Sequence, residues 1–388
     1  MTTTKPPVSA GTLLTLNSSA HTQQPMTRPN ATALVVTVVI LTTLFGWMLS
    51  FATREPGARI ARPGVDDQTL MSAEPLFGWT TWPYIFEVGA VVMFVGGLIV
   101  LVLQSIKAGR ITIGLLFFIA GNSLVWLDPW GNWGPYATYD SRLLHWPETW
   151  WWASVSPTVE PVFNFIGYYA FYIGPSALSI LLLKRVIGPR FSSGAFIHRH
   201  PLISLTIITV IVGFIIDAVI ETFFVRTGLY GYSQVPKFGS IFVGEAHQFP
   251  LLLESLSTTL PFIAVSLLWW RNDTGLTGAE RFANKFAITR KTGRAGVLAV
   301  MILFMNIGYF AYLAPFFVIR YFDLSTEVAR PWRWCAVMVY DPQGHYEKAG
   351  EQGPFFEGIW AHWPSGQPNG REVSPPVGEP LPNACRPS

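Results

Sequence analysis

The pattern of apolar residues divides the chain into a polar start, seven long apolar stretches and a polar end. The stretches cover residues 31–52, 83–106, 111–127, 162–183, 202–224, 249–270 and 295–319. Each is close to the ~20 residues that an α-helix needs to cross a bilayer, and the third is at the short end of that range. The pattern therefore predicts an all-α polytopic membrane protein with about seven transmembrane helices in one bundle.

The two ends of the chain lack this pattern. Residues 1–30 are rich in Thr, Ser and Pro without an apolar period, which predicts a disordered N-terminal tail. A transmembrane domain at 31–324 follows, and residues 325–388, with many Pro and Gly, are expected to form an extracytoplasmic tail without a core of its own. The first stretch could instead be a cleaved signal, with Ser50 and Ala52 as its small residues, but it is longer than a ~7 to 15-residue signal core and lacks a basic flank.

Basic residues in the loops predict the orientation of the bundle. The loops after the second, fourth and sixth stretches hold twelve Lys and Arg, whereas the alternate loops hold six. Because basic loops stay in the cytoplasm, we expect a multi-pass protein of the cell membrane with its N-terminus inside and its C-terminus outside.

Composition agrees with this picture and narrows the function classes. Hydrophobic residues make up 50% of the 388 and charged residues only 13%, well below the ~25% of soluble domains. The net charge of +3 is small and follows the topology, so we expect the lipid bilayer, and no nucleic acid, as a partner. Cys335 and Cys385 are too few for a multi-thiolate metal site, and they leave one disulfide open if the tail lies in an oxidising compartment.

Six carboxylates stand out because they lie in or beside the apolar stretches. A charged side chain at the centre of a spanning helix costs about 2.5 to 3.5 kcal/mol, so such acids should face the protein interior or water. The predicted topology places all six toward the outer side of the membrane, on five helices, which predicts one shared site. They are Glu87, Asp128, Glu160, Asp217, Glu221 and Glu254.

Asp217 and Glu221 form the sharpest feature of this set, in the stretch FIIDAVIETFF at 214–224. Positions i and i+4 share one face of a helix, so the two side chains should lie together. Two nearby carboxyl groups in a site of low dielectric resist ionising together, so one is expected to keep a proton and to be available as a general acid. A buried hydrogen-bonded pair without chemistry is the alternative.

Aromatic and polar residues near these acids are candidates for substrate binding. Trp and Tyr at helix ends are commonly interface anchors, and a lone His is more often a hydrogen-bonded core residue than a ligand. Glu254 has its own alternative, as a structural partner for Arg226. The candidates are Trp130, Trp133, Tyr136, Asn164, Tyr168, His247 and Glu254.

Familiar catalytic motifs are missing from the sequence. It contains no HExxH, no G-x-S-x-G, no phosphate-cradling glycine loop and no cysteine pair at ligand spacing, so neither a metal nor a cofactor is predicted. A retinal protein would need a Schiff-base lysine in the last apolar stretch, which has none. Acid chemistry on an apolar substrate in an aromatic pocket and proton-linked transport are the classes that remain.

Four segments occur in order along the predicted helices. They are Leu127-Asp128-Pro129, Val159-Glu160-Pro161, Asp217 and Glu221 followed by Gly228 and Tyr230, and DTGLTGAER at 273–281. Together they resemble the AveC-type spirocyclases, membrane proteins associated with spiroketal formation in polyketide pathways. The resemblance covers roughly residues 80–290 and leaves out both ends of the chain. Its last segment is also typical of a helix start, with Thr277 as N-cap and Glu280 completing a capping box.

The resemblance implies dehydrative cyclisation of a lipophilic hydroxy-ketone without a cofactor. Acid–base chemistry then gives the proton donor as Asp217 or Glu221, and the base as the other member of that pair or Glu160. Asp128 or Glu160, with aromatic rings such as those of Trp130 and Tyr168, would stabilise a cationic intermediate. Two other classes stay open: a proton-coupled transporter or lipid-handling protein that uses the same acids, and an assembly or sensing protein whose C-terminal tail binds a partner.

Overall fold

The computed structural model describes residues 28–57, 59–61, 82–334, 337–351 and 355–356. Nearly all of the predicted N-terminal tail lies outside the described residues, and so do Cys335 and Cys385, the two members of the possible disulfide.

Seven helical spans in the described part of the chain are long and apolar enough to cross a membrane, which confirms the predicted all-α, seven-helix class. Two of the spans consist of two helices each, α4 with α5 and α9 with α10. The helices are α1 (Arg28–Leu49), α3 (Pro83–Lys107), α4 (Ile113–Asn122), α5 (Asp128–Trp133), α6 (Val162–Leu181), α8 (Pro201–Thr227), α9 (Leu251–Ser257), α10 (Thr259–Trp269) and α13 (Arg294–Tyr321).

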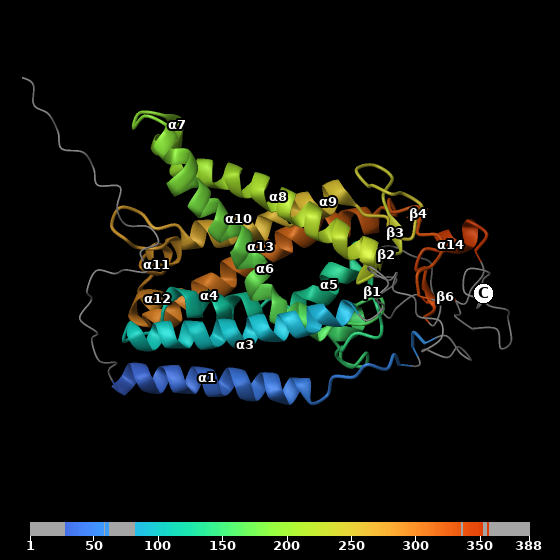
Figure 1. Cartoon of the computed structure of the whole chain (residues 1–388), viewed down its shortest axis with the longest axis horizontal. Helices are drawn as coiled ribbons and strands as arrows, with labels where there is room; N and C mark the ends of the chain where they lie inside the picture. The colour runs from blue at the N-terminus through green and yellow to red at the C-terminus, as the bar shows by residue number, and fades with distance from the viewer. Residues whose placement is uncertain (1–27, 58, 62–81, 335–336, 352–354, 357–388) are drawn as a thin grey trace, which may run out of the picture.

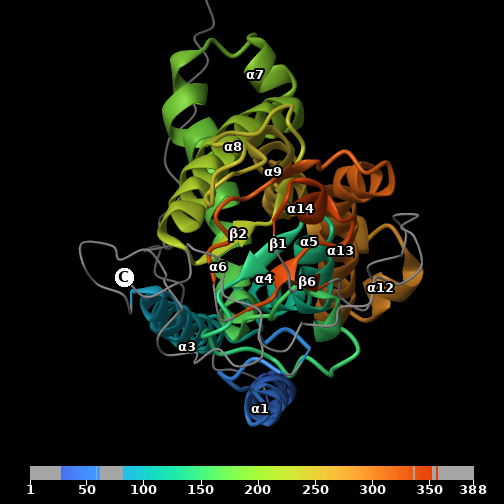
Figure 2. The same ribbon diagram turned by 90° about the vertical axis from the view of Figure 1, so that its right-hand side faces the viewer.

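The spans run in alternating directions and surround α6 (Figure 1). α6 contacts α3, α4, α8 and α10, and α13 packs on α4 and α10 behind it. α1 lies at the edge of the bundle beside α3, as Figures 1 and 2 both show. The largest apolar core fills the space between α4, α6, α10 and α13, where Met301, Met305 and Phe316 are fully buried.

The third span is longer than the apolar pattern predicts. The expected end at Leu127 was wrong, because a 3₁₀ turn at Val125–Leu127 leads directly into α5. Pro129 lies in the first turn of α5, a position where the missing amide hydrogen costs nothing because that amide would have no partner in the helix. The extension carries Asp128 and Asn132 along the inside of the bundle.

The sixth span is interrupted between α9 and α10. Pro261 has no amide hydrogen to donate to the carbonyl four residues earlier, at Ser257, which is where α9 ends. At the junction the amide and the hydroxyl of Thr258 both donate to the carbonyl oxygen of Glu254, each at 2.9 Å. Glu254 therefore lies in the short helix α9, before the break.

Short strands cover one end of the bundle, which we call the sheet end (Figure 2). β1 (Ala137–Tyr139) pairs antiparallel with β2 (Tyr230–Tyr232), so Tyr139 lies opposite Tyr230. β3 (Gln234–Val235) pairs with β4 (Glu327–Val328), and β5 (Val339–Tyr340) pairs in parallel with β6 (Phe355–Phe356). The buried side chains Trp334, Met338 and Tyr340 join a core cluster of the bundle itself, so this part of the C-terminal segment packs on the helices.

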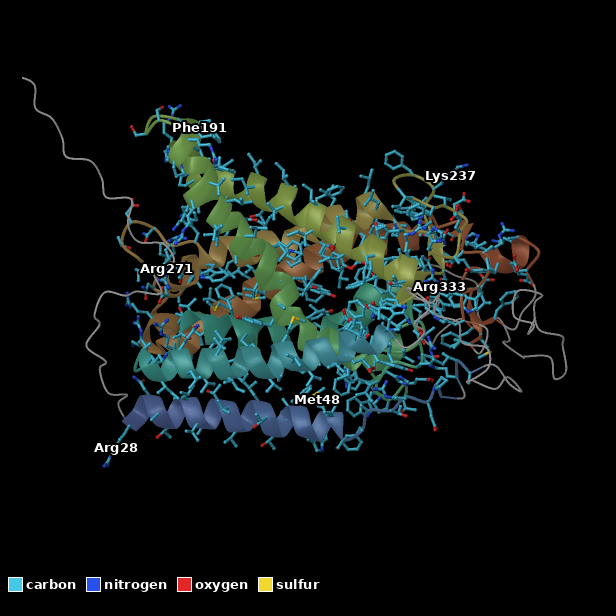
Figure 3. The ribbon with its side chains drawn as sticks, in the orientation of Figure 1. Arg28, Met48, Phe191, Lys237, Arg271 and Arg333 are labelled. Carbon is cyan, nitrogen blue, oxygen red and sulfur yellow. The ribbon has the colours of Figure 1, made fainter. Side chains whose placement is uncertain are left out.

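The opposite end carries the short helices α7 (Phe196–Arg199), α11 (Gly278–Ala283) and α12 (Ala287–Lys291), and α14 (His345–Lys348) lies at the sheet end. We call this opposite end the basic end, because it holds the larger set of Lys and Arg counted above. Figure 3 shows Arg28 and Arg271 there, and Lys237 and Arg333 at the sheet end.

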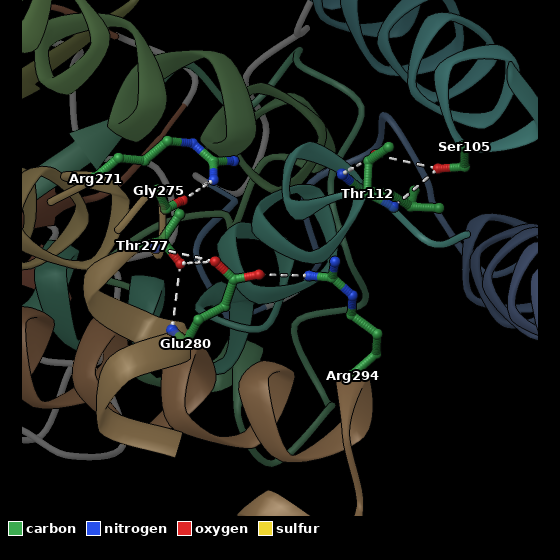
Figure 4. A network of polar contacts seen from close by, with 8 residues as sticks. Ser105, Thr112, Arg271, Gly275, Thr277, Glu280 and Arg294 are labelled. Atoms are coloured by element: carbon green, nitrogen blue, oxygen red, sulfur yellow. Dashed lines mark hydrogen bonds and ion pairs between the residues drawn. The ribbon is translucent and has the colours of Figure 1, made fainter. Parts of the chain in front are cut away.

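α11 starts with the capping box predicted for Thr277 and Glu280 (Figure 4). The Thr277 hydroxyl accepts from the Glu280 amide at 3.2 Å, and the Glu280 carboxylate accepts from the Thr277 amide at 2.9 Å. Arg294 completes the network with an ion pair to Glu280 at 3.0 Å. The segment therefore ties α11 to the start of α13, which is a structural role.

We expect Thr277→Ala to lower the free energy of unfolding by about 1 kcal/mol, because the cap oxygen that satisfies the Glu280 amide is lost. Thermal unfolding in detergent measures this change. Thr274→Ala is the matched control, since the exposed Thr274 hydroxyl bonds only the Asn272 side chain in the same loop. Equal melting temperatures for the two variants would contradict the capping role.

Candidate functional site

A cavity of about 360 Å³ lies in the half of the bundle next to the sheet end. Its walls come from α3, α5, α6, α8, α9 and α13, and β1 and β2 cover it at the sheet end. The lining side chains are mainly aromatic, and the polar ones among them are chiefly carboxyl, amide and phenol groups. The residues used below are Phe86, Ala90, Met93, Asp128, Asn132, Tyr139, Asn164, Gly167, Tyr168, Ala170, Tyr172, Ile220, Glu221, Phe224, Tyr230, Tyr232, Glu254, Thr258, Tyr309 and Tyr312.

Asp128 and Glu160 form a carboxyl pair at one wall of this cavity. Asp128 is the first residue of α5. Its Oδ2 accepts from the Asn164 amide at 2.8 Å and its Oδ1 accepts from the Tyr309 hydroxyl at 3.3 Å. Glu160 lies behind it in the turn before α6 and hydrogen-bonds with it. This set of donors suits a carboxylate at Asp128.

Glu160 is held by neutral donors and is 1% exposed. Its Oε2 accepts from the Asn132 amide at 2.8 Å and from the Ser156 hydroxyl. Burial, followed by the nearby charge of Asp128 and the hydrogen bond with it, raises the pKa of Glu160 well above its ordinary value. The raised pKa favours the protonated form of Glu160, which can donate its proton to Asp128.

This raised pKa predicts a pH dependence of stability. The folded protein favours the protonated form of Glu160, so its contribution to folding stability is greatest at or below the ordinary value of 4.5 and declines as the pH rises toward the folded pKa. We expect Glu160→Gln to remove this decline, because Gln is neutral at every pH and can still accept from Ser156 and donate to Asp128. Melting temperatures in detergent between about pH 5 and pH 8 measure it.

The comparison needs an exposed carboxyl group as its control. Glu245→Gln is the control, since the Glu245 side chain is 58% exposed in the loop before α9. The wild type and Glu245→Gln should lose thermal stability together toward higher pH, while Glu160→Gln loses less. Three parallel curves would show that the folded protein does not favour the protonated form of Glu160.

A second group of acids lies across the cavity on α8 and α9. Asp217 and Glu221 are one turn apart on α8, as the spacing predicts, and Glu254 of α9 lies beside them. Glu221 and Glu254 line the cavity, whereas Asp217 is fully buried behind them, next to the hydroxyls of Ser255 and Thr258. Three carboxyl groups this close in a buried site do not all ionise, so the group holds at least one proton.

Tyrosine hydroxyls donate to acids of both groups. Tyr312 donates to Glu254 Oε1 at 2.8 Å, and Tyr232 donates to Glu221 Oε2 at 3.4 Å. On the other side, Tyr168 and Tyr309 share a hydrogen bond at 3.1 Å, and Tyr309 continues to Asp128. Burial raises the pKa of Tyr232 well above its ordinary value, so this phenol is neutral and acts as a donor.

The structure brings five of the eleven predicted site residues to the cavity wall. These are Asp128, Glu221, Asn164, Tyr168 and Glu254. Two more, Asp217 and Glu160, lie behind the wall, Asp217 next to Glu221 and Glu160 next to Asp128.

The other four predicted residues lie elsewhere. Trp130 packs on Trp133 at a centroid distance of 5.8 Å, and Trp133 and Tyr136 stack on the buried guanidinium of Arg320. His247 lies in the loop before α9, where its Nε2 is 3.2 Å from Arg226 and 3.0 Å from Glu245. Arg226 is thus the neighbour of His247, and Glu254 is instead bound by Tyr312 and Thr258.

Glu87, the sixth acid at the predicted depth, also lies away from the cavity. It forms an ion pair with Arg54 at 2.7 Å and accepts from the Leu144 amide. Depth alone therefore does not place an acid in the site, because it does not say which side of a helix the acid occupies.

Several lining residues were not predicted from the sequence. Tyr309 and Tyr312 are one turn apart on α13, and this spacing of two phenols in an apolar helix is a signal that could have been found. Asn132 was missed because α5 was not expected. Tyr139 and Tyr232 depend on the pairing of β1 with β2, which no local pattern indicates.

The described residues offer no group of three or more His, Cys, Asp or Glu side chains arranged to hold a metal ion. The five acids around the cavity are spread over two walls, and amide or hydroxyl groups donate to four of them, Asp128, Glu160, Glu221 and Glu254. Such an arrangement is suited to moving and holding protons.

Comparison with known families gives one match. The family model described as "Spirocyclase AveC-like" matches residues 108–340, more than half of the chain. No curated protein and no solved structure matches the chain. The expected extent of the resemblance, roughly 80–290, was wrong at both ends. The match continues through α13, which carries Tyr309 and Tyr312, and reaches Tyr340 in β5.

Proposed function

This chain belongs to the AveC-like spirocyclase family, and from that premise we propose that it closes a lipophilic dihydroxy-ketone into a spiroketal with loss of water. Membership of the family supports a cyclase-type function in general. The observation that carries the finer proposal is the aromatic cavity with carboxyl groups on two walls, Asp128 on one and Glu221 and Glu254 on the other.

The proposed reaction has three steps and needs no external oxidant or reductant. One hydroxyl of the substrate adds to the ketone and gives a hemiketal. The hemiketal hydroxyl takes a proton from an acid and leaves as water, which produces an oxocarbenium ion. The second hydroxyl attacks this cation and loses its proton to a base. The two new C–O bonds replace the carbonyl C=O bond: addition breaks its π bond and moves the proton of the first hydroxyl to the carbonyl oxygen, and departure of water breaks the remaining C–O bond. The proton lent by the acid equals the proton gained by the base.

In this proposal Glu221 is the proton donor. It lines the cavity, and its neighbours Asp217 and Glu254 resist a further negative charge, so the proton is available at the wall. Asp217 is a positioning residue, since it lies behind the wall and acts through Glu221. The sequence leaves open whether Asp217 or Glu221 donates the proton, and we propose Glu221.

Asp128 is the proposed base and stabiliser of the cation. It faces the cavity from the opposite wall, and Asn164, Tyr309 and Glu160 all stabilise its charged form. The faces of rings such as Tyr168 and Tyr172 add a cation–π contribution of about 2 kcal/mol when water is excluded.

Conversion of a synthetic dihydroxy-ketone tests the proposal. We expect the protein in lipid nanodiscs to give a product lighter by one water, with one configuration at the spiro carbon, because the cavity holds the oxocarbenium ion while one face is attacked. Protein-free nanodiscs are the control for uncatalysed closure. Equal rates and equal stereoisomer mixtures with and without protein would overturn the proposal, and pH-driven uptake of an unchanged substrate into proteoliposomes would favour the transporter class.

A further inference from the structure

The exposure of the cavity lining is uneven around the bundle. The described lining residues on α5, α9, α13, β1 and β2 are all buried, as is Thr258 at the α9–α10 junction. Those that keep partial or full exposure lie on α3, α6 and α8 only. Met93 of α3 is the most open of them, with 49% of its surface exposed. The cavity is therefore shielded at the sheet end and reaches the surface through the side of the bundle.

α6 passes between α3 and α8 (Figure 1), and the lining residues with partial or full exposure lie on these three helices. α6 packs on both of these helices, and it presents Gly167 and Ala170 to the cavity between them. A Cβ at Gly167 would meet no atom within 4 Å, so the space over this part of α6 is open. Toward the sheet end, Phe86 of α3 and Phe224 of α8 close the gap with an edge-to-face contact at a centroid distance of 4.9 Å.

The surface around this opening is apolar. Val92 of α3 is 64% exposed and Val219 of α8 is 65% exposed, and both belong to spans of the length and composition of transmembrane helices. Exposed aliphatic side chains on such spans face lipid. The opening therefore leads into the hydrocarbon region of the bilayer.

A carboxyl group inside the cavity offers a binding position for a polar group of a substrate. Glu254 is 6% exposed and lines the cavity, and its Oε2 has no hydrogen-bond partner among the described residues. A buried carboxyl oxygen without a partner costs free energy, and a substrate hydroxyl would satisfy it.

We propose that the gap between α3 and α8 over Gly167 and Ala170 is a lateral portal through which a lipophilic hydroxylated substrate passes between the bilayer and the acid-lined cavity. This inference rests on the proposed function for the class of substrate. In this proposal the residues of α3, α6 and α8 at the portal limit how wide a substrate can be and still enter.

The test uses a long-chain dihydroxy-ketone analogue that carries a photoreactive diazirine, added to the full-length protein in nanodiscs. Labelled peptides are located by mass spectrometry, and the labelling rate is followed with time. Gly167→Leu and Ile220→Phe place bulk in the portal from two different helices. Gly174→Leu and Ile211→Phe are their matched controls on the same helices, because neither residue lines the cavity, a Cβ at Gly174 also meets open space and Ile211 is 54% exposed.

In the wild type and both controls we expect labelling of peptides that contain Tyr168 or Tyr309, at similar rates. Both portal variants should label these peptides about tenfold more slowly and lower kcat/KM by a similar factor, while kcat at saturating substrate changes less, since the acids are untouched. Equal labelling rates in portal variants and controls would overturn the portal. A wild type that cyclises the substrate but labels other peptides would also overturn it, whereas a wild type that neither cyclises nor binds the analogue would overturn the proposed function.

Discussion

Glu221→Gln lowers the rate of cyclisation by about 10²- to 10⁴-fold, the usual contribution of one general acid or base. Gln has nearly the same shape as Glu and can still accept from Tyr232, but it has no carboxyl proton to give to the leaving hydroxyl. Asp128→Asn is expected to have an effect of the same order, because the amide neither takes the proton of the attacking hydroxyl nor stabilises the cation by charge. Rates of product formation in nanodiscs measure both.

Two controls separate chemistry from folding in this prediction. Glu87→Gln removes a carboxylate at the same end of the bundle that binds Arg54 and does not line the cavity, so its rate should stay close to that of the wild type. Asp217→Asn should have a smaller effect than Glu221→Gln, because Asp217 acts only through its neighbour. If Glu221→Gln and Asp128→Asn are as active as Glu87→Gln at similar melting temperatures, the two carboxyl groups are not the acid and the base.

Arg320→Met lowers the free energy of unfolding by roughly 3 to 5 kcal/mol, the largest effect on stability that we predict. Arg320 is fully buried near the end of α13. Its guanidinium lies 3.9 Å from the ring centroid of Trp133 and 4.3 Å from that of Tyr136, and it donates to the Trp133 carbonyl and, at 2.8 Å, to the Tyr340 hydroxyl. Met fills part of the space but replaces none of these polar contacts.

The loss should be greatest at the sheet end, because Arg320 connects α5 with β5. We therefore expect faster proteolysis after residue 324 in addition to a lower melting temperature in detergent. Arg330→Met is the control, since Arg330 lies in the segment after residue 324, is half exposed and forms a long, weak ion pair with Glu351 at 3.9 Å. If the two variants melt and are cleaved alike, Arg320 does not hold this segment on the bundle.

The stabilising role of Arg320 also explains why Trp133 and Tyr136 appear in the sequence near the acids without lining the cavity. Aromatic residues close to a carboxylate indicate an aromatic environment, but they do not indicate whether the rings face a substrate or a buried cation from elsewhere in the chain. Arg320 is distant in sequence from Trp133 and Tyr136, so their contact depends on how α13 packs against α5.

The sequence by itself determined the seven spans and the pairing of Asp217 with Glu221, because both follow from local rules: apolar length and the helical repeat. It also determined the start of α11 at Thr277, since a capping box involves residues only three apart.

Only the tertiary structure decided which acids face one cavity. Asp128 comes to face Glu221, Asp217 falls behind the wall and Glu87 is turned away to Arg54. The rotation of each helix about its axis and the break before α10 fix these positions, and both result from packing between spans far apart in the chain. Depth in the membrane can be counted along a sequence, but the direction of a side chain depends on its neighbours.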